Sequence, residues 1–478
     1  MKNKKFSVLL DISLATLGHK GGIPHDTRVM VTLFSMLPEV DLTLLIYDPG
    51  GATLTHRFTG KRATLLEQLV NQALYLESLT SHRTVVSRNP FLRQIQKIWY
   101  VYNLFFKRTI STEKLLDTFK EVIMRQALSY SIDLKDLKTA NNWDILAASL
   151  GNSVMYTRSL FALPQPKLDT GDFDFVIFED VRPLRVSKRT IKLVRYHDII
   201  PLIRPDLVGH ARSFIKWHFI GLKACSKDSI FICNSEPTKN DLLTYIPELE
   251  NRVYVIPYPV ASHFYFDSRT ELLPQIVEQR WCSATGVKGP VNKVNHQTKY
   301  ILHVATIEPR KNLINLIKAF NFLQKQYNDT LLMVVGNLGW QFEPILKAMY
   351  PLVRTGRLVH LEEVAPDELR LLYSHALAVC FPSYYEGFGL PPLEAMACGA
   401  PVVLSDIPAH RWVAADAGVY CNPYNPESIA EALSAILDDP FLRDSLKEKG
   451  KLRALEFSMD KVAYQWLALF EELKGSSG

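Results

Sequence analysis

Cysteines are few in this chain, and none is spaced to hold a metal. The 478 residues include six cysteines, and no two of them form a C-x-x-C pair. Pairs of that kind usually mark structural zinc, so we expect no zinc site. Most of the cysteines lie in apolar runs, where they act as small core residues, and a reducing cytosol is the simplest compartment.

Long hydrophobic runs are also missing. A transmembrane helix needs a stretch of roughly 18 or more apolar residues, and the sequence has none of that length. The basic start, residues 1–5, leads into apolar residues 6–10, which superficially resemble a signal peptide. Because that run is short and meets Asp11 at once, we interpret it as a first β-strand.

Charge of one sign is only slightly in excess. The chain has 55 Lys and Arg against 49 Asp and Glu, a net charge of +6 that is spread along the sequence. This excess is too weak to favour nucleic acid, but it fits an anionic substrate or an anionic membrane surface. The length of 478 residues favours two domains, because single cores rarely grow beyond about 250–300 residues.

Short apolar runs alternate with helical patterns in both halves of the chain. In the first half we predict strand 6–10, helix 27–37 and strand 42–47, with later strands at 175–178, 193–196, 230–234 and 252–256. In the second half we predict strands at 300–305, 331–336, 358–361, 376–381 and 401–405, and helices at 312–327, 342–350, 366–374, 426–438 and 457–473. Such alternation predicts parallel, doubly wound α/β sheets.

These patterns also divide the chain. We predict a Rossmann-like domain over 1–260 with a mostly helical insertion at about 54–150, a linker over 261–298, a second Rossmann-like domain over 299–455 and a final helix and tail over 456–478. The centre of the insertion, 91–108, is aromatic, apolar and basic. It is either a membrane-surface helix or an amphipathic helix packed on the domain, and its dense apolar positions favour packing.

Two glutamates bracket the most informative run, E-G-F-G-L-P-P-L-E, which spans 386–394. The Gly-Phe-Gly turn follows a predicted strand, and Pro391 or Pro392 suits the first turn of a helix. The turn therefore aims free backbone amides at a helix start, which is a ready anion site. Amides that hold a diphosphate and carboxylates that hold sugar and ribose hydroxyls fit an enzyme that binds a sugar nucleotide.

This run resembles the E-x7-E motif of the family-4 retaining glycosyltransferases, which have the GT-B fold. The match continues through 381–383 before the motif and 397–403 after it. The resemblance implies two Rossmann-like, doubly wound parallel-sheet domains that face a cleft. The N-terminal domain is then expected to bind the acceptor and the C-terminal domain the nucleotide sugar, with the final helix crossing back to the first domain.

The resemblance also assigns roles within the motif. Glu394 is expected to hold ribose hydroxyls, and Glu386 hydroxyls of the donor sugar, with a covalent nucleophile as the lesser possibility for Glu386. The turn between them is expected to bind the donor; it consists of Gly387, Phe388, Gly389 and Leu390.

Two cations are predicted beside this turn. Arg310 and Lys311 follow the strand at 300–305, and ligands of open α/β sheets bind beyond the carboxyl ends of strands. Arginine can grip a diphosphate with two hydrogen bonds, and lysine acts as a point charge. The segment resembles the E-P-R-K-N run of the family, in which Gly often stands where this chain has Ala305 and an additional Arg is common nearby. Because this chain lacks the additional Arg, the phosphate contacts are expected to fall on Arg310 and Lys311.

Three further segments carry family resemblances. The run 197–201, H-D-I-I-P, resembles the H-D-x-x-P segment of mannosyl- and rhamnosyltransferases, which implies that His197 contacts the donor sugar or supports transfer. The alternative is a structural histidine capped by Asp198. Gly21 and Gly22 resemble the glycine loop, where bare backbone approaches diphosphate or acceptor. Trp340, after Gly339, resembles the subgroup that uses GDP-mannose, although core packing explains it equally well.

One segment is a candidate for metal binding, because glycosyltransferases of the GT-A class use Asp-x-Asp to hold a divalent ion. Asp172 and Asp174 have this spacing, but they precede the predicted strand 175–178. Ligand sites lie at carboxyl ends of strands, so we interpret the pair as a turn and expect no metal and no cofactor.

The resemblance implies a retaining transferase for polysaccharide or O-antigen-type synthesis. GDP-mannose is the favoured donor, dTDP-rhamnose the second. The expected acceptor is a glycan or a polyprenyl-diphosphate-linked glycan at the cytoplasmic face of a membrane. Nucleic acid is not expected as a partner. A non-catalytic family member acting as a partner subunit stays open, although the retained glutamates and the Arg310–Lys311 pair argue against it.

Overall fold

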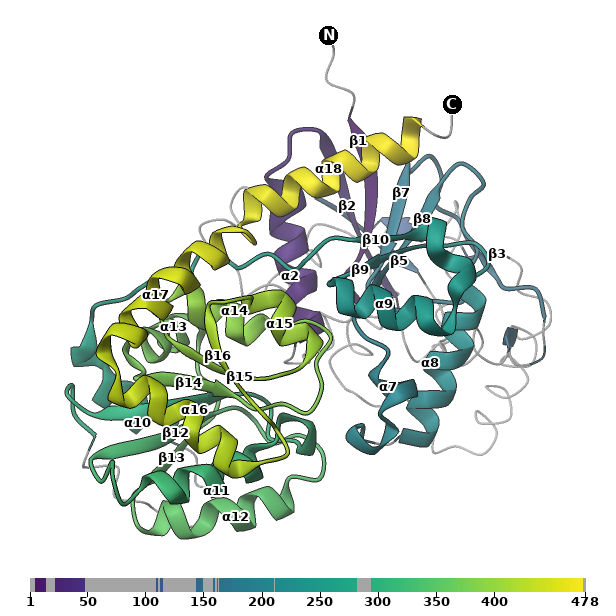
Figure 1. Cartoon of the computed structure of the whole chain (residues 1–478). Helices are drawn as coiled ribbons and strands as arrows, with labels where there is room; N and C mark the ends of the chain where they lie inside the picture. Colours follow the sequence, from purple (N-terminus) through teal and green to yellow (C-terminus); the bar gives the residue numbers. More distant parts are fainter. Residues whose placement is uncertain are drawn as a thin grey trace, which may run out of the picture.

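The computed structural model shows two α/β domains joined by a long C-terminal helix (Figure 1). It describes residues 5–13, 22–47, 109–110, 112–114, 143–148, 158–159, 161, 163–209, 211–281 and 294–475. Most of the predicted insertion at 54–150, including its centre at 91–108, lies outside these ranges. Within them, no helix is both long and apolar enough to span a membrane.

The N-terminal domain is built on a sheet with the strand order β10-β9-β8-β7-β1-β2-β5-β4. All pairs are parallel except the edge pair of β4 and β5. The central strands are buried on both faces, which is why they read as continuous apolar runs. The strands are β1 (Phe6–Asp11), β2 (Val40–Tyr47), β4 (Thr112–Lys114), β5 (Asp144–Ala148), β7 (Phe175–Phe178), β8 (Ile191–Tyr196), β9 (Ile230–Cys233) and β10 (Val253–Val255), with β3 (Thr109–Ile110) and β6 (Lys167–Leu168) in a small separate sheet.

The helices of this domain follow its strands. Helix α2 begins at Gly22, five residues before the predicted start, and ends at Ser35 rather than at residue 37. The others are α7 (Ile200–Ile203), α8 (Ala211–Cys225) and α9 (Glu236–Tyr245). Helix α9 has a clear start signal, because the side chain of Ser235 caps it by accepting a hydrogen bond from the amide of Thr238.

The C-terminal domain has a six-stranded parallel sheet with the order β13-β12-β11-β14-β15-β16. Its strands are β11 (Lys299–Val304), β12 (Thr330–Val335), β13 (Leu358–Leu361), β14 (Ala378–Phe381), β15 (Val402–Ser405) and β16 (Gly418–Cys421). Its helices are α11 (Leu313–Leu323), α12 (Glu343–Arg354), α13 (Pro366–His375), α14 (Leu390–Ala397), α15 (Pro408–Ala414), α16 (Pro426–Asp438) and α17 (Pro440–Leu455). The expected doubly wound, parallel sheet is confirmed here.

Helix α10 (Leu273–Arg280) lies within the predicted linker at 261–298. It packs on α13, its buried residues join the core of the C-terminal domain, and the backbone of Arg280 accepts a hydrogen bond from the amide of Glu362. Helix α18 (Met459–Gly475) runs from the C-terminal domain across the N-terminal domain (Figure 1). Phe470 of α18 stacks on Phe175 of β7 with ring centroids 4.5 Å apart, so the end of the chain completes the N-terminal core.

Candidate functional site

The predicted strand–turn–helix of the motif is present. Strand β14 ends at Phe381, and α14 begins at Leu390 after a turn whose last residue, Gly389, has φ of +119°. Only glycine adopts that backbone readily, which explains the residue at this position. Pro391 lies in the first helical turn, where its missing N–H is not needed.

Arg310 and Lys311 lie in a short 3-10 turn, Pro309–Lys311, between β11 and α11. Asn312, with φ of 60°, ends this turn. Its side-chain amide donates to the carbonyl of Pro382 at 2.8 Å, which fastens the turn to the strand that carries the motif. The two predicted segments, far apart in sequence, are thereby brought together.

Glu386 is the meeting point of the two segments. Its Oε2 lies 2.5 Å from Nη1 of Arg310, and its Oε1 lies 2.6 Å from Nζ of Lys311. Burial by itself would raise the pKa of Glu386, but the charges of Arg310 and Lys311 outweigh it and hold that pKa well below the usual value. The carboxylate is therefore ionised and shared by two cations.

Glu308 is a second acid beside Arg310. Its Oε1 lies 2.8 Å from Nη2 of Arg310, and only 3% of its side chain is exposed. Burial raises the pKa of Glu308 despite that contact. Arg310 thus lies between two carboxylates, of which Glu386 is the more strongly ionised.

Glu394 lies elsewhere on the motif. It is buried in the first half of α14, and its Oε2 accepts a hydrogen bond of 3.2 Å from the hydroxyl of Tyr373. Burial raises the pKa of Glu394 to about 7. The two glutamates of the motif therefore have opposite electrostatic surroundings: Glu386 is charged and paired with cations, whereas Glu394 is only partly ionised near neutral pH.

The turn of the motif is packed against the N-terminal domain. A Cβ on Gly387 would lie 2.3 Å from the carbonyl oxygen of His197, so no other residue fits without moving the backbone. The ring of Phe388 lies 4.8 Å from that of Tyr258. The carboxyl ends of the two sheets therefore meet at this turn.

His197 has both ring nitrogens engaged within its own domain. Nε2 lies 2.9 Å from the carbonyl oxygen of Glu179, which can only accept, and we therefore infer that Nε2 carries the hydrogen. Nδ1 then accepts from the hydroxyl of Tyr258, with which it forms a short contact. Burial, with Arg195 adding to it, lowers the pKa of His197 to about 3, so the ring is neutral. Asp198 instead accepts from the amide of Ile200, the first residue of α7.

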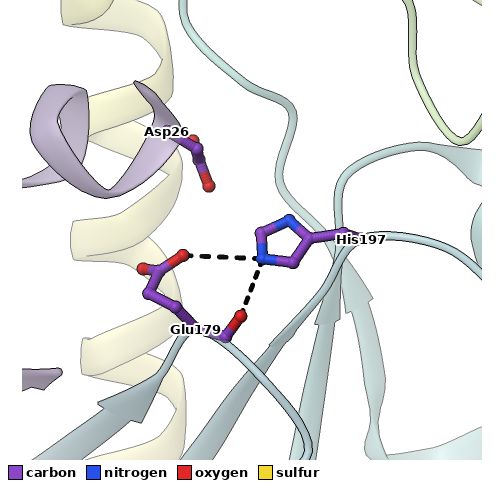
Figure 2. A group of neighbouring side chains, drawn as sticks. All are labelled: Asp26, Glu179 and His197. Carbon is purple, nitrogen blue, oxygen red and sulfur yellow. Dashed lines mark hydrogen bonds and ion pairs between the residues drawn. The ribbon is translucent and has the colours of Figure 1, made fainter. Parts of the chain in front are cut away.

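His197 also belongs to a buried group with Asp26 and Glu179, whose nitrogen and oxygen atoms lie within 4.8 Å of one another (Figure 2). Two of these atoms are already engaged within the protein, whereas Oδ1 of Asp26 and both carboxylate oxygens of Glu179 have no hydrogen-bond partner among the described residues. The Nε2 atom of His197 has no free lone pair if it donates to Glu179, and Oδ2 of Asp26 accepts from Arg195 at 3.1 Å. Burial, with Asp26 adding to it, raises the pKa of Glu179 well above the usual value.

The remaining predicted residues are placed as follows. Gly21 lies outside the described residues, and Gly22 is the first residue of α2. Trp340 is half-buried, and a Cβ on Gly209 would lie 2.6 Å from its ring, so it contacts the N-terminal domain rather than a core. Asp174 lies in a turn before β7, as predicted, and its carboxylate accepts from the amide of Ser7 and pairs with Lys474.

Several residues of this region were not predicted from the sequence. Asn234, Ser235 and Thr238 lie at the start of α9 and hydrogen-bond to His197 or to Gly387. Asn234 is the last residue of the predicted strand at 230–234, and the other two follow it. Asp26 and Arg28 of α2 are buried as well.

Comparison with known proteins agrees with this geometry. Residues 288–453 match the sequence model of the family described as glycosyl transferases group 1. The chain is 33% identical over 175 residues to O-antigen chain mannosyltransferase B of Escherichia coli, a match that covers 36% of this chain and 46% of that protein. It is 28% identical over 286 residues to the serotype-specific mannosyltransferase WbdA of Escherichia coli, covering 59% of this chain and 33% of that protein. The chain thus matches about a third to a half of the length of these relatives.

Solved structures of low sequence identity share the fold over the whole chain. Sucrose-phosphate synthase from Thermosynechococcus elongatus superposes with a TM-score of 0.57 at 14% identity, covering 99% of this chain and 100% of that chain. WaaG, a glycosyltransferase involved in lipopolysaccharide biosynthesis, gives 0.53 at 13% identity, covering 97% and 99%. Residues 288–453 are therefore similar in sequence to the group 1 glycosyltransferases, and the chain as a whole has the GT-B fold with mannosyltransferases among its sequence relatives.

Proposed function

We propose that the protein is a retaining glycosyltransferase that moves mannose from GDP-mannose to a glycan or a polyprenyl-diphosphate-linked glycan at the cytoplasmic face of a membrane. The observation that carries the proposal is the contact of Arg310 and Lys311 with Glu386 at the carboxyl edge of the C-terminal sheet. Two cations and a carboxylate on one loop pair are the groups that a sugar diphosphate needs.

In this proposal the two cations exchange partners when the donor binds. Without donor, Glu386 neutralises Arg310 and Lys311. The diphosphate carries more negative charge than one carboxylate and offers several oxygens to the same donors. Glu386 is then released towards the hydroxyls of the sugar, while Arg310 and Lys311 stabilise the charge that grows on the departing diphosphate.

The transfer step needs no base from the protein. The bond between the anomeric carbon and the diphosphate oxygen breaks, and the acceptor oxygen bonds to that carbon from the same face. The acceptor proton passes to an oxygen of the leaving diphosphate. A base role for His197 is unfavourable, because its Nδ1 already faces the hydroxyl of Tyr258 and burial lowers its pKa to about 3. We assign His197 to shaping the floor beneath Gly387.

The preference for mannose is supported by the relatives, which are named as O-antigen mannosyltransferases. The half-buried Trp340 near the N-terminal domain offers a surface against which the base of the nucleotide can pack. Rhamnose from dTDP-rhamnose is the second candidate, because the run at 197–201 resembles both kinds of enzyme.

A two-stage experiment tests the proposal. Thermal shift with GDP, UDP and dTDP should show the largest stabilisation with GDP. A screen of nucleotide sugars, read by nucleoside diphosphate release and product mass, should then give a hexose transferred from GDP-mannose. Stabilisation by dTDP with transfer of a deoxyhexose would replace mannose by rhamnose, and no response to any of the three nucleotides would favour the non-catalytic partner subunit.

A further inference from the structure

The loop that carries Glu386 is held from the N-terminal domain by one face of α9. The carbonyl oxygen of Gly387 accepts two hydrogen bonds, from Oγ of Ser235 at 2.6 Å and from Oγ1 of Thr238 at 2.9 Å. A carbonyl has two lone pairs, so both hydroxyls can donate to it at once. All three groups are buried, which removes water as a competing partner.

The residue before Glu386 is held by the same helix. The hydroxyl of Tyr385 forms a short hydrogen bond with Oδ2 of Asp241. Positions 235, 238 and 241 are three residues apart, so they fall on one side of the helix, and α9 also packs against α15 of the C-terminal domain. The neighbours of Glu386 on both sides are therefore fastened to α9.

The other side of the loop is fastened within the C-terminal domain. The carbonyl oxygen of Tyr385 accepts from Nη1 of Arg310 at 3.1 Å, and the amide of Tyr384 donates to the carbonyl of Arg310 at 3.0 Å. The loop thus lies between its own phosphate-binding cations and a helix of the opposite domain. Its position depends on both.

We propose that Ser235, Thr238 and Asp241 of the N-terminal domain are positioning residues that hold the Glu386 loop for transfer, an inference that rests on the proposed function. The contacts require the two domains to be together, so the loop is fully ordered only in that arrangement. Nucleotide binding belongs to the C-terminal domain and does not need α9. Loss of the contacts should therefore lower the rate of transfer and leave the affinity for GDP unchanged.

The test uses the double variant Thr238→Val and Tyr385→Phe, which removes two hydroxyls with little change of shape and leaves the Ser235 cap intact. Three quantities are measured on the full chain: the dissociation constant of GDP, the rate of GDP release from GDP-mannose with water as acceptor, and hydrogen exchange of the amides at 384–390. Relative to the wild type, we expect a rate of GDP release roughly tenfold lower and hydrogen exchange of the loop roughly tenfold faster. The dissociation constant of GDP should stay within about twofold of the wild-type value.

Two matched variants control the experiment. Thr244→Val removes an exposed hydroxyl of the same helix, which donates only to the carbonyl of Asn240, and should change nothing. Thr238→Ser with Tyr385 intact keeps the donor to Gly387 and should behave as the wild type. If exchange at 384–390 in the double variant equals that of the wild type, or GDP affinity falls as much as the rate, the proposal is wrong.

The exchange measurement separates this proposal from the proposed function. If the wild-type protein binds no GDP, UDP or dTDP and releases none from the sugar nucleotides, the proposed function fails. The exchange of 384–390 still shows then whether α9 holds the loop. If exchange at 384–390 is slow in the wild type and faster in the double variant, α9 holds the loop, but for a purpose other than glycosyl transfer.

Discussion

Replacing Glu386 by glutamine should separate the stability of the donor-free protein from its affinity for nucleotide. The variant keeps the shape of the side chain but removes the negative charge between Arg310 and Lys311. Side-chain exposures of 11%, 17% and 16% for Glu386, Arg310 and Lys311 place this cluster largely out of water. Removing one partner of a buried ion pair typically costs about 3–5 kcal/mol, and the partial exposure here favours about 3 kcal/mol.

That loss should appear as a lower melting temperature. For a domain of about 150–250 residues, 1 kcal/mol corresponds to roughly 2–4 °C, so Glu386→Gln should melt roughly 6–12 °C below the wild type. Asp406→Asn is the control, because Asp406 and Arg411 form an exposed pair with 53% and 51% of their side chains accessible. Exposed pairs contribute about 0–1 kcal/mol, and the control should therefore melt within about 4 °C of the wild type.

Nucleotide affinity should move in the opposite direction. In the wild type, GDP must displace Glu386 from the cations, and charges about 3 Å apart attract by roughly 5 kcal/mol at an effective dielectric constant near 20. The diphosphate recovers most, but not all, of this attraction when it replaces Glu386. We therefore expect the variant, in which nothing has to be displaced, to bind GDP about tenfold more tightly, a gain of about 1.4 kcal/mol in the free energy of binding. Calorimetric titration measures this, and GDP should raise the melting temperature of the variant more than that of the wild type. Weaker GDP binding by Glu386→Gln, or a melting temperature equal to that of the control, would refute the exchange of partners.

Three further predictions test separate parts of the site. Lys311→Ala should lower the rate of GDP release from GDP-mannose on the order of 10²-fold, because one fixed charge on the leaving diphosphate is lost; a normal rate would remove Lys311 from the phosphate site. Glu394→Gln should flatten the dependence of stability on pH, because burial raises the pKa of Glu394 in the folded protein from 4.5 to about 7. The stabilisation by the protonated side chain is therefore complete below pH 4.5 and is lost as the pH rises towards 7, a change of about 3 kcal/mol in the free energy of unfolding measured with urea. A variant with the pH profile of the wild type would contradict this. Tyr258→Phe removes the donor to Nδ1 of His197 but leaves Nε2–H on the carbonyl oxygen of Glu179. Nitrogen NMR should therefore show a shifted Nδ1 resonance with the Nε2–H tautomer kept, and loss of that tautomer would contradict its assignment to the Glu179 contact.

The parallel sheets could be predicted because their strands are buried on both faces and therefore form continuous apolar runs. The strand at 175–178 and the helix at 426–438 have the predicted bounds. Helix α17 was missed because its sequence, P-F-L-R-D-S-L-K-E-K-G-K-L-R-A-L, is largely polar. Its few buried residues are Leu446, Gly450 and Ala454, which provide too weak a pattern to detect, and the helix packs against α14 and α16. The antiparallel edge strand β4 has only three residues and left no signal either.

The contacts around Glu386 and Gly387 differ in how far a sequence can predict them. The contact of Arg310 with Glu386 follows from topology, because β11 and β14 are neighbours and their carboxyl ends meet at one edge. Gly387 could be assigned to a turn, but its need for glycine comes from the carbonyl of His197, which another domain brings within 2.3 Å of the missing Cβ. Its φ is not in the left-handed region, so the residue carries no local signature of that requirement. Ser235 likewise looks like an ordinary helix cap, which it is, and only the packing of two domains makes its hydroxyl a donor to the loop that carries Glu386. Contacts between neighbouring strands of one sheet can therefore be predicted from the strand order. Contacts between the two domains can be found only from a structure that contains both domains.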